Sequence, residues 1–266
     1  MTAASQVHVE RCGAVLRLTL DRAPVNAFDG TLLARLDAAL GQAEADDGVA
    51  VLHLRSAHKA FCAGADLALI RHSISTPQGL DAMLATVQGL QRVFARLEAL
   101  PCLTLAELGG AALGGGFELA LACDWRIAAH EARLGLPEAG LGLLAAAGGT
   151  QRLTKLVGPG LARRLLLGAE TVGGEQALAL GLVQWSVPRA GLAAAAQALA
   201  ERAATVPRHT MAENKRCIAL AMAVQGDGYA AEIAATRRLY EHPETRRRVS
   251  AFIDRSAAPT EEKACP

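Results

Sequence analysis

Residues 109–124, GGAALGGGFELALACD, place three consecutive glycines between a strand-like run and a helix-like run. The run before them, CLTLAELGG, has the pattern of a strand, and FELALA after them has the pattern of a short helix. Glycines before a helix bring backbone N–H groups close to a negatively charged atom, and α/β proteins commonly bind ligands at strand-to-helix turns. The stretch therefore predicts an α/β fold with an anion-binding turn, and Glu118 follows that turn directly.

The first half of the chain alternates strand and helix patterns. VHVER and AVLRLTLDR are separated by Cys12 and Gly13 and predict a hairpin. Leucines at helical spacing predict a helix over residues 31–45, and a second helix is expected over 81–100. The strand pattern VLHLRS lies between these helices, and residues 68–82 are expected to form a loop.

From about residue 159 the pattern becomes nearly continuous helix, interrupted by the strand pattern GLVQWSV. These helical segments are rich in Ala and Leu, so we expect them to pack on a neighbouring subunit as well as on the chain's own core. The expected helices span residues 159–168, 174–180, 190–205, 211–224 and 228–240.

The composition excludes several classes of protein. A chain of 266 residues that is 52% hydrophobic can bury the core of one large domain. Lysine and arginine total 27 and nearly balance 26 aspartates and glutamates, so we expect no nucleic-acid partner and no membrane. The N-terminus lacks a basic-then-apolar leader, and no apolar run reaches the roughly 18 residues of a membrane span. Six cysteines without C-x-x-C pairs predict reduced thiols and no metal site, so we expect a cytoplasmic protein.

Two well-known glycine loops do not fit residues 109–116. A Walker phosphate loop requires Lys and then Ser or Thr where this chain has Gly115 and Gly116. A dinucleotide-binding loop requires G-x-G-x-x-G, and no register of these residues supplies it. The glycines alone are therefore also consistent with a tight turn or with close packing of the chain.

A second turn of small residues follows the strand pattern VLHLRS. In KAFCAGADL, residues 59–67, the small residues Ala63, Gly64 and Ala65 precede Asp66. Two such turns could each direct one backbone N–H group at a single oxygen atom. That arrangement is the geometry of an oxyanion hole.

Two carboxylates, Glu118 in GGFELALA and Glu138 in LGLPEAGLG, lie in mainly apolar stretches. A carboxylate is costly to bury unless it is paired or protonated, so both glutamates are functional candidates. Each also has an ordinary interpretation. Glu118 could be a charge stabilised at a helix N-terminus, and Glu138 could be a helix-start residue after Pro137. Together with the two turns, the pair favours a catalytic site.

Three blocks, KAFCAGADL, GGAALGGGFELALACD and LGLPEAGLGLLAAAGGTQRL, resemble the signature blocks of the enoyl-CoA hydratase/isomerase, or crotonase, superfamily in order and spacing. The resemblance covers about residues 20–187 and extends more loosely through the C-terminus. It implies an α/β, crotonase-like spiral of repeated β-β-α units with a helical C-terminal trimerisation region. It also implies a core with the acyl-CoA site at residues 1–195, and a region at 196–266 for oligomerisation and as a lid. The expected assembly is a homotrimer or a dimer of trimers.

The resemblance further implies the ligand, an acyl thioester of coenzyme A. Coenzyme A is then part of the substrate, and no separate cofactor is expected. The N–H groups of Ala65 and Gly115 are expected to hold the thioester oxygen, with Glu118 acting chiefly on the water and Glu138 chiefly on the α-proton. Other contacts with the substrate are expected from Ala63, Gly64, Asp66, Leu67, Gly114 and Ala146.

The activity that the resemblance implies is that of an enoyl-CoA hydratase. Such a lyase adds water across the 2,3 double bond of a 2-trans-enoyl-CoA and gives a 3-hydroxyacyl-CoA. Isomerases of the superfamily often keep only the position that matches Glu138, whereas this chain has both glutamates. The alternatives are an enoyl-CoA isomerase or a hydratase of an unusual branched or cyclic acyl-CoA, and a non-catalytic or RNA-binding protein of the same fold.

Two segments depart from the pattern that is common in the family. Ala145 and Ala146 stand where Pro and Gly are common. Ala146 adds a Cβ and disfavours positive φ, so the wall near the catalytic water is expected to differ in shape, with modest activity on short linear substrates. Arg246, Arg247 and Arg248 either contact phosphates of coenzyme A or form a solvated helix face, which is typical of such a charge run.

Overall fold

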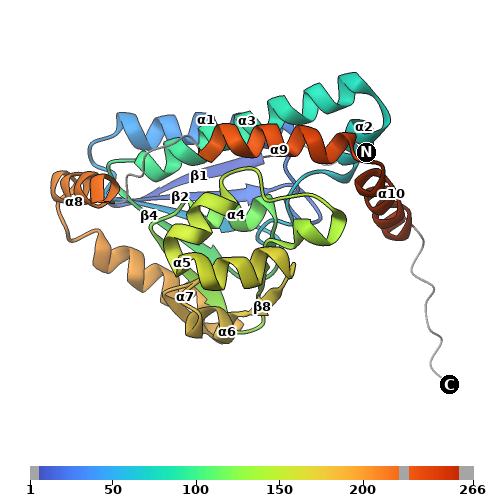
Figure 1. The fold of residues 1–266 in the computed structure, drawn as a ribbon. Coiled ribbons are helices and arrows are strands. Elements are labelled where there is room, and N and C mark those ends of the chain that lie inside the picture. Colours follow the sequence, from blue (N-terminus) through green and yellow to red (C-terminus); the bar gives the residue numbers. More distant parts are fainter. Residues whose placement is uncertain (1–5, 222–227, 258–266) are drawn as a thin grey trace.

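The computed structural model of the protein describes residues 6–221 and 228–257 (Figure 1). This part of the chain contains a six-stranded sheet, a three-stranded sheet and the helices that cover them. The strands are β1 Gln6–Cys12, β2 Val15–Asp21, β3 Val51–Ser56, β4 Leu103–Leu108, β5 Ala112–Leu113, β6 Trp125–Ala129, β7 Arg133–Gly135, β8 Thr171–Gly173 and β9 Trp185–Val187. The helices are α1 Gly30–Ala45, α2 Leu67–Ser75, α3 Pro77–Ala99, α4 Gly115–Leu121, the 3₁₀ helix η1 Pro137–Leu141, α5 Gly149–Leu167, α6 Gly174–Ala179, α7 Arg189–Ala203, α8 Arg208–Ala221, α9 Gly228–Glu241 and α10 Pro243–Ala257.

The larger sheet has the strand order β1-β2-β3-β4-β6-β9. β1 and β2 form the antiparallel hairpin that the sequence predicts, with Cys12 opposite Val15 and Gly13 in the turn. The remaining neighbours in this sheet are parallel, so the carboxyl ends of β3 and β4 meet at one edge. The two turns of small residues follow those two strand ends, which brings them together.

Helices α1 and α3 pack against each other (Figure 1). Each presents a stripe of buried leucines, as the helical spacing in the sequence predicts. α3 begins earlier than the expected residue 81, because Thr76 Oγ1 accepts a hydrogen bond from the Gly79 N–H at 2.9 Å and Pro77 suits the first helical turn.

The prediction of a loop at residues 68–82 is wrong. Residues Leu67–Ser75 form α2, which is followed directly by the start of α3. The Asp66 carboxylate caps α2 and accepts a hydrogen bond from the Ala68 N–H at 2.8 Å. His72, which the sequence places in this loop, is therefore an exposed residue in the last turn of a helix.

The helix expected at residues 159–168 is only the second half of α5, which begins at Gly149. Gly158 has φ 75° and ψ 165°, outside the helical region, and Pro159 follows it. These two residues kink α5. In the sequence they resemble a helix boundary, so the first half of α5 was not predicted. Farther along, α7 runs through position 195 and packs against β3, β4 and β6. The division of the chain at residue 195 stays a prediction.

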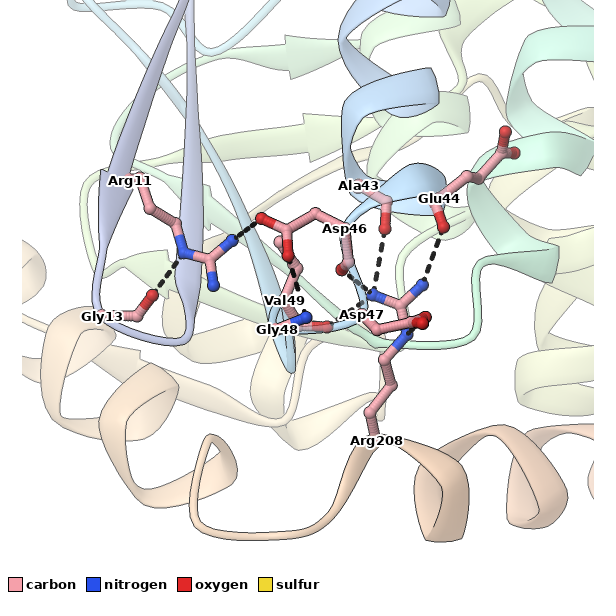
Figure 2. Close-up of polar contacts among 9 residues, drawn as sticks. All are labelled: Arg11, Gly13, Ala43, Glu44, Asp46, Asp47, Gly48, Val49 and Arg208. Carbon is pink, nitrogen blue, oxygen red and sulfur yellow. Dashed lines mark hydrogen bonds and ion pairs between the residues drawn. The ribbon is translucent and has the colours of Figure 1, made fainter.

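The C-terminal helices are attached to the core through Arg208, the first residue of α8 (Figure 2). Its guanidinium donates hydrogen bonds to the carbonyl oxygens of Ala43, Asp46 and Val49 at 3.0, 2.6 and 2.8 Å. A fourth bond reaches the Glu44 carbonyl at 3.2 Å. These carbonyls lie at or just beyond the C-terminus of α1, where a cation is stabilised by the helix dipole.

Helices α9 and α10 pack on α2 and α3 and form a second apolar cluster beside the main core (Figure 1). Tyr240 and Val249 are buried in this cluster together with Met83 and Val87 of α3. No helix within residues 6–221 and 228–257 is long and apolar enough to cross a membrane.

Candidate active site

A cavity of about 500 Å³ lies between the two small-residue turns, α3 and the C-terminal helices. Most of the residues that the sequence singles out line it, and they come from segments far apart in the chain. They are Ala63, Gly64, Ala65, Gly114, Gly115, Glu118, Glu138 and Ala146.

The two turns approach each other at Gly64. Its φ is +94°, and a Cβ there would lie 3.1 Å from the Leu113 carbonyl oxygen and 3.5 Å from the Gly115 nitrogen. The Leu113 N–H donates to the Cys62 carbonyl at 3.0 Å and ties the segments together. Any side chain at position 64 would therefore be strained and would separate the two turns.

The N–H group of Ala65 points away from Phe28. The flanking groups bond to Phe28: its N–H donates to the Gly64 carbonyl at 2.7 Å, and its carbonyl accepts from the Asp66 N–H at 3.1 Å. In such a parallel bridge, the residue between the two bonds directs its own N–H to the opposite side. Ala65 also lines the cavity, and the role of its N–H group in an oxyanion hole stays a prediction.

The three glycines of the opening stretch have different roles. Gly114 caps α4 with φ +53°, and its carbonyl accepts from the N–H groups of Phe117 and Glu118 at 2.8 and 2.9 Å. Gly115 is the first residue of α4, where an N–H group has no carbonyl partner within the helix. A Cβ at Gly116 would lie 2.0 Å from the Cys62 carbonyl oxygen. Close packing therefore explains Gly116, whereas Gly115 is left to face the cavity.

Glu118 is buried, with 3% of its surface exposed. Its Oε1 accepts a hydrogen bond from the Gly149 N–H at 2.8 Å. Gly149 is the first residue of α5, so the N-terminus of that helix stabilises negative charge on this carboxyl group. The bond also fixes the orientation of the Glu118 side chain.

Glu138 has very different surroundings. The residue is partly exposed, but its Oε2 is buried and has no hydrogen-bond partner in the described part of the chain. Burial of the carboxyl group raises the pKa of Glu138 to about 7. Its Oε1 lies 2.8 Å from the point that a Cβ on Gly114 would occupy, and Glu118 Oε2 lies 3.9 Å from the corresponding point on Gly115. The two carboxyl groups therefore flank Gly114 and Gly115.

The wall formed by Ala145, Ala146 and Ala147 is held from two sides. Gln91 Nε2 of α3 donates to the Ala146 carbonyl at 2.7 Å, and an Arg152 guanidinium nitrogen donates to the Ala147 carbonyl at 3.2 Å. None of the three alanines has a positive φ. The alanines thus fit this backbone, and Ala146 lies in the cavity wall.

The structure does not bring Asp66 into the cavity lining. Besides capping α2, its carboxylate pairs with Arg22 at 2.5 Å. Leu67 begins α2, and its side chain lies outside the described residues. The contact of both residues with substrate stays a prediction.

The three arginines Arg246, Arg247 and Arg248 are exposed on α10. The Arg246 guanidinium donates to the Tyr240 carbonyl at 2.9 Å, near the end of α9. This placement agrees with a solvated helix face. A contact with phosphates of coenzyme A stays a prediction.

The family resemblance assigns a lid to residues 196–266, but the sequence singled out none of the residues there that line the cavity. Thr236, Leu239 and Tyr240 of α9 and Phe252 of α10 line the cavity. Burial raises the pKa of Tyr240 to about 12. A stripe of apolar residues on these helices signals burial, but nothing in it identifies the surface that they cover.

The fold and the family profile together place the chain among the enzymes of the crotonase superfamily. The profile of the enoyl-CoA hydratase/isomerase family matches residues 10–263. The chain belongs to that family, as the sequence motifs predict.

Relatives and solved structures agree with this conclusion. The short-chain-enoyl-CoA hydratase of Clostridium acetobutylicum is 37% identical over 200 residues, which are 74% of this chain and 75% of the relative. The crotonyl-CoA hydratase of Syntrophomonas wolfei is 42% identical over 173 residues, 64% of each protein, so the chain spans less than two thirds of that relative. The crystal structure of the enoyl-CoA hydratase from Bacillus anthracis matches with a TM-score of 0.76 at 30% identity and covers 94% of this chain and 96% of that one. The predicted crotonase-like fold is confirmed.

Proposed function

We propose that the protein is an enoyl-CoA hydratase that adds water to a 2-trans-enoyl-CoA and forms a 3-hydroxyacyl-CoA. The observation that carries this proposal is the contrast between the two carboxyl groups in one cavity. Glu118 is stabilised as a carboxylate by the N-terminus of α5. Glu138 has an unpaired buried oxygen and a pKa of about 7, so a large fraction of it is protonated at neutral pH. Hydration needs one group of each kind.

In the proposed reaction, the thioester oxygen lies between the N–H groups of Ala65 and Gly115. Glu118 removes a proton from a water molecule as the water oxygen bonds to the β-carbon. The electron pair of the double bond moves toward the thioester, and the resulting enolate charge is stabilised by the two N–H donors. Loss of one such donor typically lowers the rate about 10²- to 10³-fold.

The reaction is completed when Glu138 gives its proton to the α-carbon and becomes a carboxylate. Glu118 then holds the proton taken from water, and exchange with solvent restores both groups. The net change is the addition of one water molecule, with no change in oxidation state overall. Coenzyme A serves as the handle of the substrate, and a trimeric or hexameric assembly remains part of the proposal.

The test uses Glu118→Gln and Glu138→Gln, which keep the shape of each side chain. Each substitution should lower hydration of crotonyl-CoA by roughly 10²- to 10⁴-fold, while binding of a saturated acyl-CoA is retained. The product is followed by mass, because hydration adds one water and isomerisation leaves the mass unchanged. Turnover near the wild-type rate in either variant, or a product of unchanged mass, would contradict the proposal.

A further inference from the structure

Thr245 is a polar residue on the buried face of α10, where the next positions of the same face are apolar. Val249 and Ile253 follow it at spacings of four residues, and all three side chains are buried. Residues four apart lie on one face of a helix, so the pattern alone would favour an apolar residue at position 245. The hydroxyl group at this position is explained by its hydrogen-bond partner.

That partner is the carbonyl oxygen of Gly142, which accepts a hydrogen bond from Thr245 Oγ1 at 2.9 Å. Gly142 caps the C-terminus of η1, the turn that carries Glu138, and has φ +74°. A Cβ on Gly142 would lie 2.8 Å from Thr245 Oγ1 and 3.3 Å from Thr245 Cα. Glycine is therefore needed there both for the backbone conformation and for the close approach of α10.

The turn η1 is short and only partly covered. None of its five residues, Pro137–Leu141, is buried. Its end is closed by bonds from the Gly142 N–H to the Ala139 carbonyl and from the Leu143 N–H to the Glu138 carbonyl, both at 3.0 Å. Such short 3₁₀ turns have poor hydrogen-bond geometry. The bond from Thr245 comes from outside the turn and ties it to α10, which packs on α2 and α9 as well as on η1.

The ionisation of Glu138 depends on where this turn lies. Burial is the main cause that raises the pKa of Glu138 to about 7. The other titratable residues in the described lining of the cavity are Glu118 of α4 and Tyr240 of α9, and α2, α3 and α10 add only uncharged side chains to it. On α10, Arg246, Arg247 and Arg248 are exposed. A shift of the turn toward solvent would therefore lower the pKa of Glu138 by removing its main cause.

We propose that Thr245 is a positioning residue for Glu138: its bond to Gly142 holds η1 against α10 and keeps the carboxyl group of Glu138 buried in the cavity. The catalytic consequence rests on the proposed hydratase function, in which Glu138 gives a proton to the α-carbon. Thr245 acts through the turn and needs no contact with substrate. Helix α10 thereby controls the acid-base chemistry of the site in addition to forming part of its wall.

The experiment follows the ionisation of Glu138 by infrared difference spectroscopy between pH values. The carbonyl stretch of its protonated carboxyl group is assigned by its absence in Glu138→Gln. In the wild type this band should disappear as pH rises through about 7. Thr245→Val keeps the shape of the side chain and removes the hydroxyl, so the pKa of Glu138 should fall by roughly 1. Thr245→Ser keeps the hydroxyl and should titrate like the wild type.

Thr104→Val is the matched control, because Thr104 is also a buried threonine whose hydroxyl bonds outside its own element. That hydroxyl donates to the Asp124 carboxylate at 2.9 Å, and Asp124 also pairs with Lys215 of α8 at 2.7 Å. Thr104 is not part of the cavity lining. Both valine variants should be less stable in urea unfolding, but only Thr245→Val should change the pKa of Glu138. If Thr245→Val does not fold, Thr245→Ala is titrated in its place.

Two results would overturn the proposal. One is the same pKa of Glu138 in the wild type and in Thr245→Val. The other is an equal fall of that pKa in Thr104→Val, which would mean that any loss of stability loosens the turn.

Hydration of crotonyl-CoA by the same variants separates this inference from the hydratase proposal. If Thr245→Val lowers the pKa of Glu138 but Glu138→Gln hydrates at the wild-type rate, the hydratase proposal fails and Thr245 keeps its role. If Glu138→Gln is inactive but Thr245→Val titrates like the wild type, the role assigned to Thr245 is wrong. If both proposals hold, kcat/KM for hydration by Thr245→Val should begin to fall at a correspondingly lower pH than in the wild type.

Discussion

The N–H group of Gly149 donates a 2.8 Å hydrogen bond to Oε1 of Glu118, so the first residue of α5 holds the carboxylate that α4 carries. The bond joins α4 to α5, and it requires a glycine at position 149. A Cβ at Gly149 would lie 2.8 Å from Glu118 Oε1 and 2.7 Å from the Ala145 Cβ. Position 149 therefore sets the orientation of Glu118.

If Glu118 has the proposed role, Gly149→Ala should lower kcat for hydration by at least about 10-fold, because a misplaced catalytic group is costly even at small displacements. Steady-state kinetics with crotonyl-CoA measure this effect. Gly160→Ala is the control on the same helix, where an added Cβ meets nothing within 4 Å. That variant should be fully active and equally or more stable. Equal activity of the two variants would show that position 149 does not control Glu118.

The pKa of Glu138, raised to about 7 by burial, predicts opposite pH dependences for the two directions of the proposed hydratase reaction. Hydration needs Glu138 protonated, so kcat/KM for hydration should fall as pH rises through about 7. Dehydration of a 3-hydroxyacyl-CoA needs Glu138 ionised, so its kcat/KM should rise over the same interval. The residual activity of Glu138→Gln should lack this pH dependence. A hydration profile that is flat across neutral pH in the wild type would contradict the assignment.

The parts of the site that the sequence predicts are those encoded by local motifs. Gly64, Gly115, Glu118 and Glu138 lie in short blocks in which the residue types and their spacing both carry information. A turn of small residues after a strand predicts its own N–H geometry, and the parallel sheet then brings two such turns to one edge. These residues could therefore be predicted without knowing how distant parts of the chain pack.

The wall of the cavity could not be predicted in this way. Thr236 and Tyr240 enter the site because α9 packs on α2 and α3, and the apolar stripe of a helix does not specify its partner. The start of α2 had a local signal, since Asp66 is a good N-cap residue, but its place beside the glycine turn favoured a ligand contact instead. The first half of α5 was missed because Gly158 and Pro159 resemble the end of one helix and the start of another.

The same burial of Glu138 predicts an effect on stability. Its pKa is 4.5 when unperturbed and about 7 in the folded protein. The contribution of Glu138 to the free energy of unfolding is therefore fully present below about pH 4.5. It is lost as pH rises through about 7, because the folded protein must then bury the charged carboxylate. The loss is on the order of 3 kcal/mol. Glu138→Gln should become more stable relative to the wild type across this interval, as measured by urea unfolding at each pH. Glu241→Gln, at an exposed position, should follow the wild type.

The attachment of α8 to the core through Arg208 predicts that removing this one side chain will clearly lower the free energy of unfolding. The Arg208 side chain is 12% exposed and donates to carbonyls at the C-terminus of α1, which would lose their partner in Arg208→Ala. Because hydrogen bonds to charged groups contribute about 1.5–3 kcal/mol each, we expect a loss of free energy of unfolding on the order of 2 kcal/mol. Arg216→Ala on the same helix is the control, since Arg216 is 69% exposed and pairs only with the exposed Glu213 among the described residues. It should change stability by less than about 0.5 kcal/mol. Equal effects in urea unfolding would mean that the carbonyl contacts of Arg208 contribute nothing beyond an ordinary surface arginine.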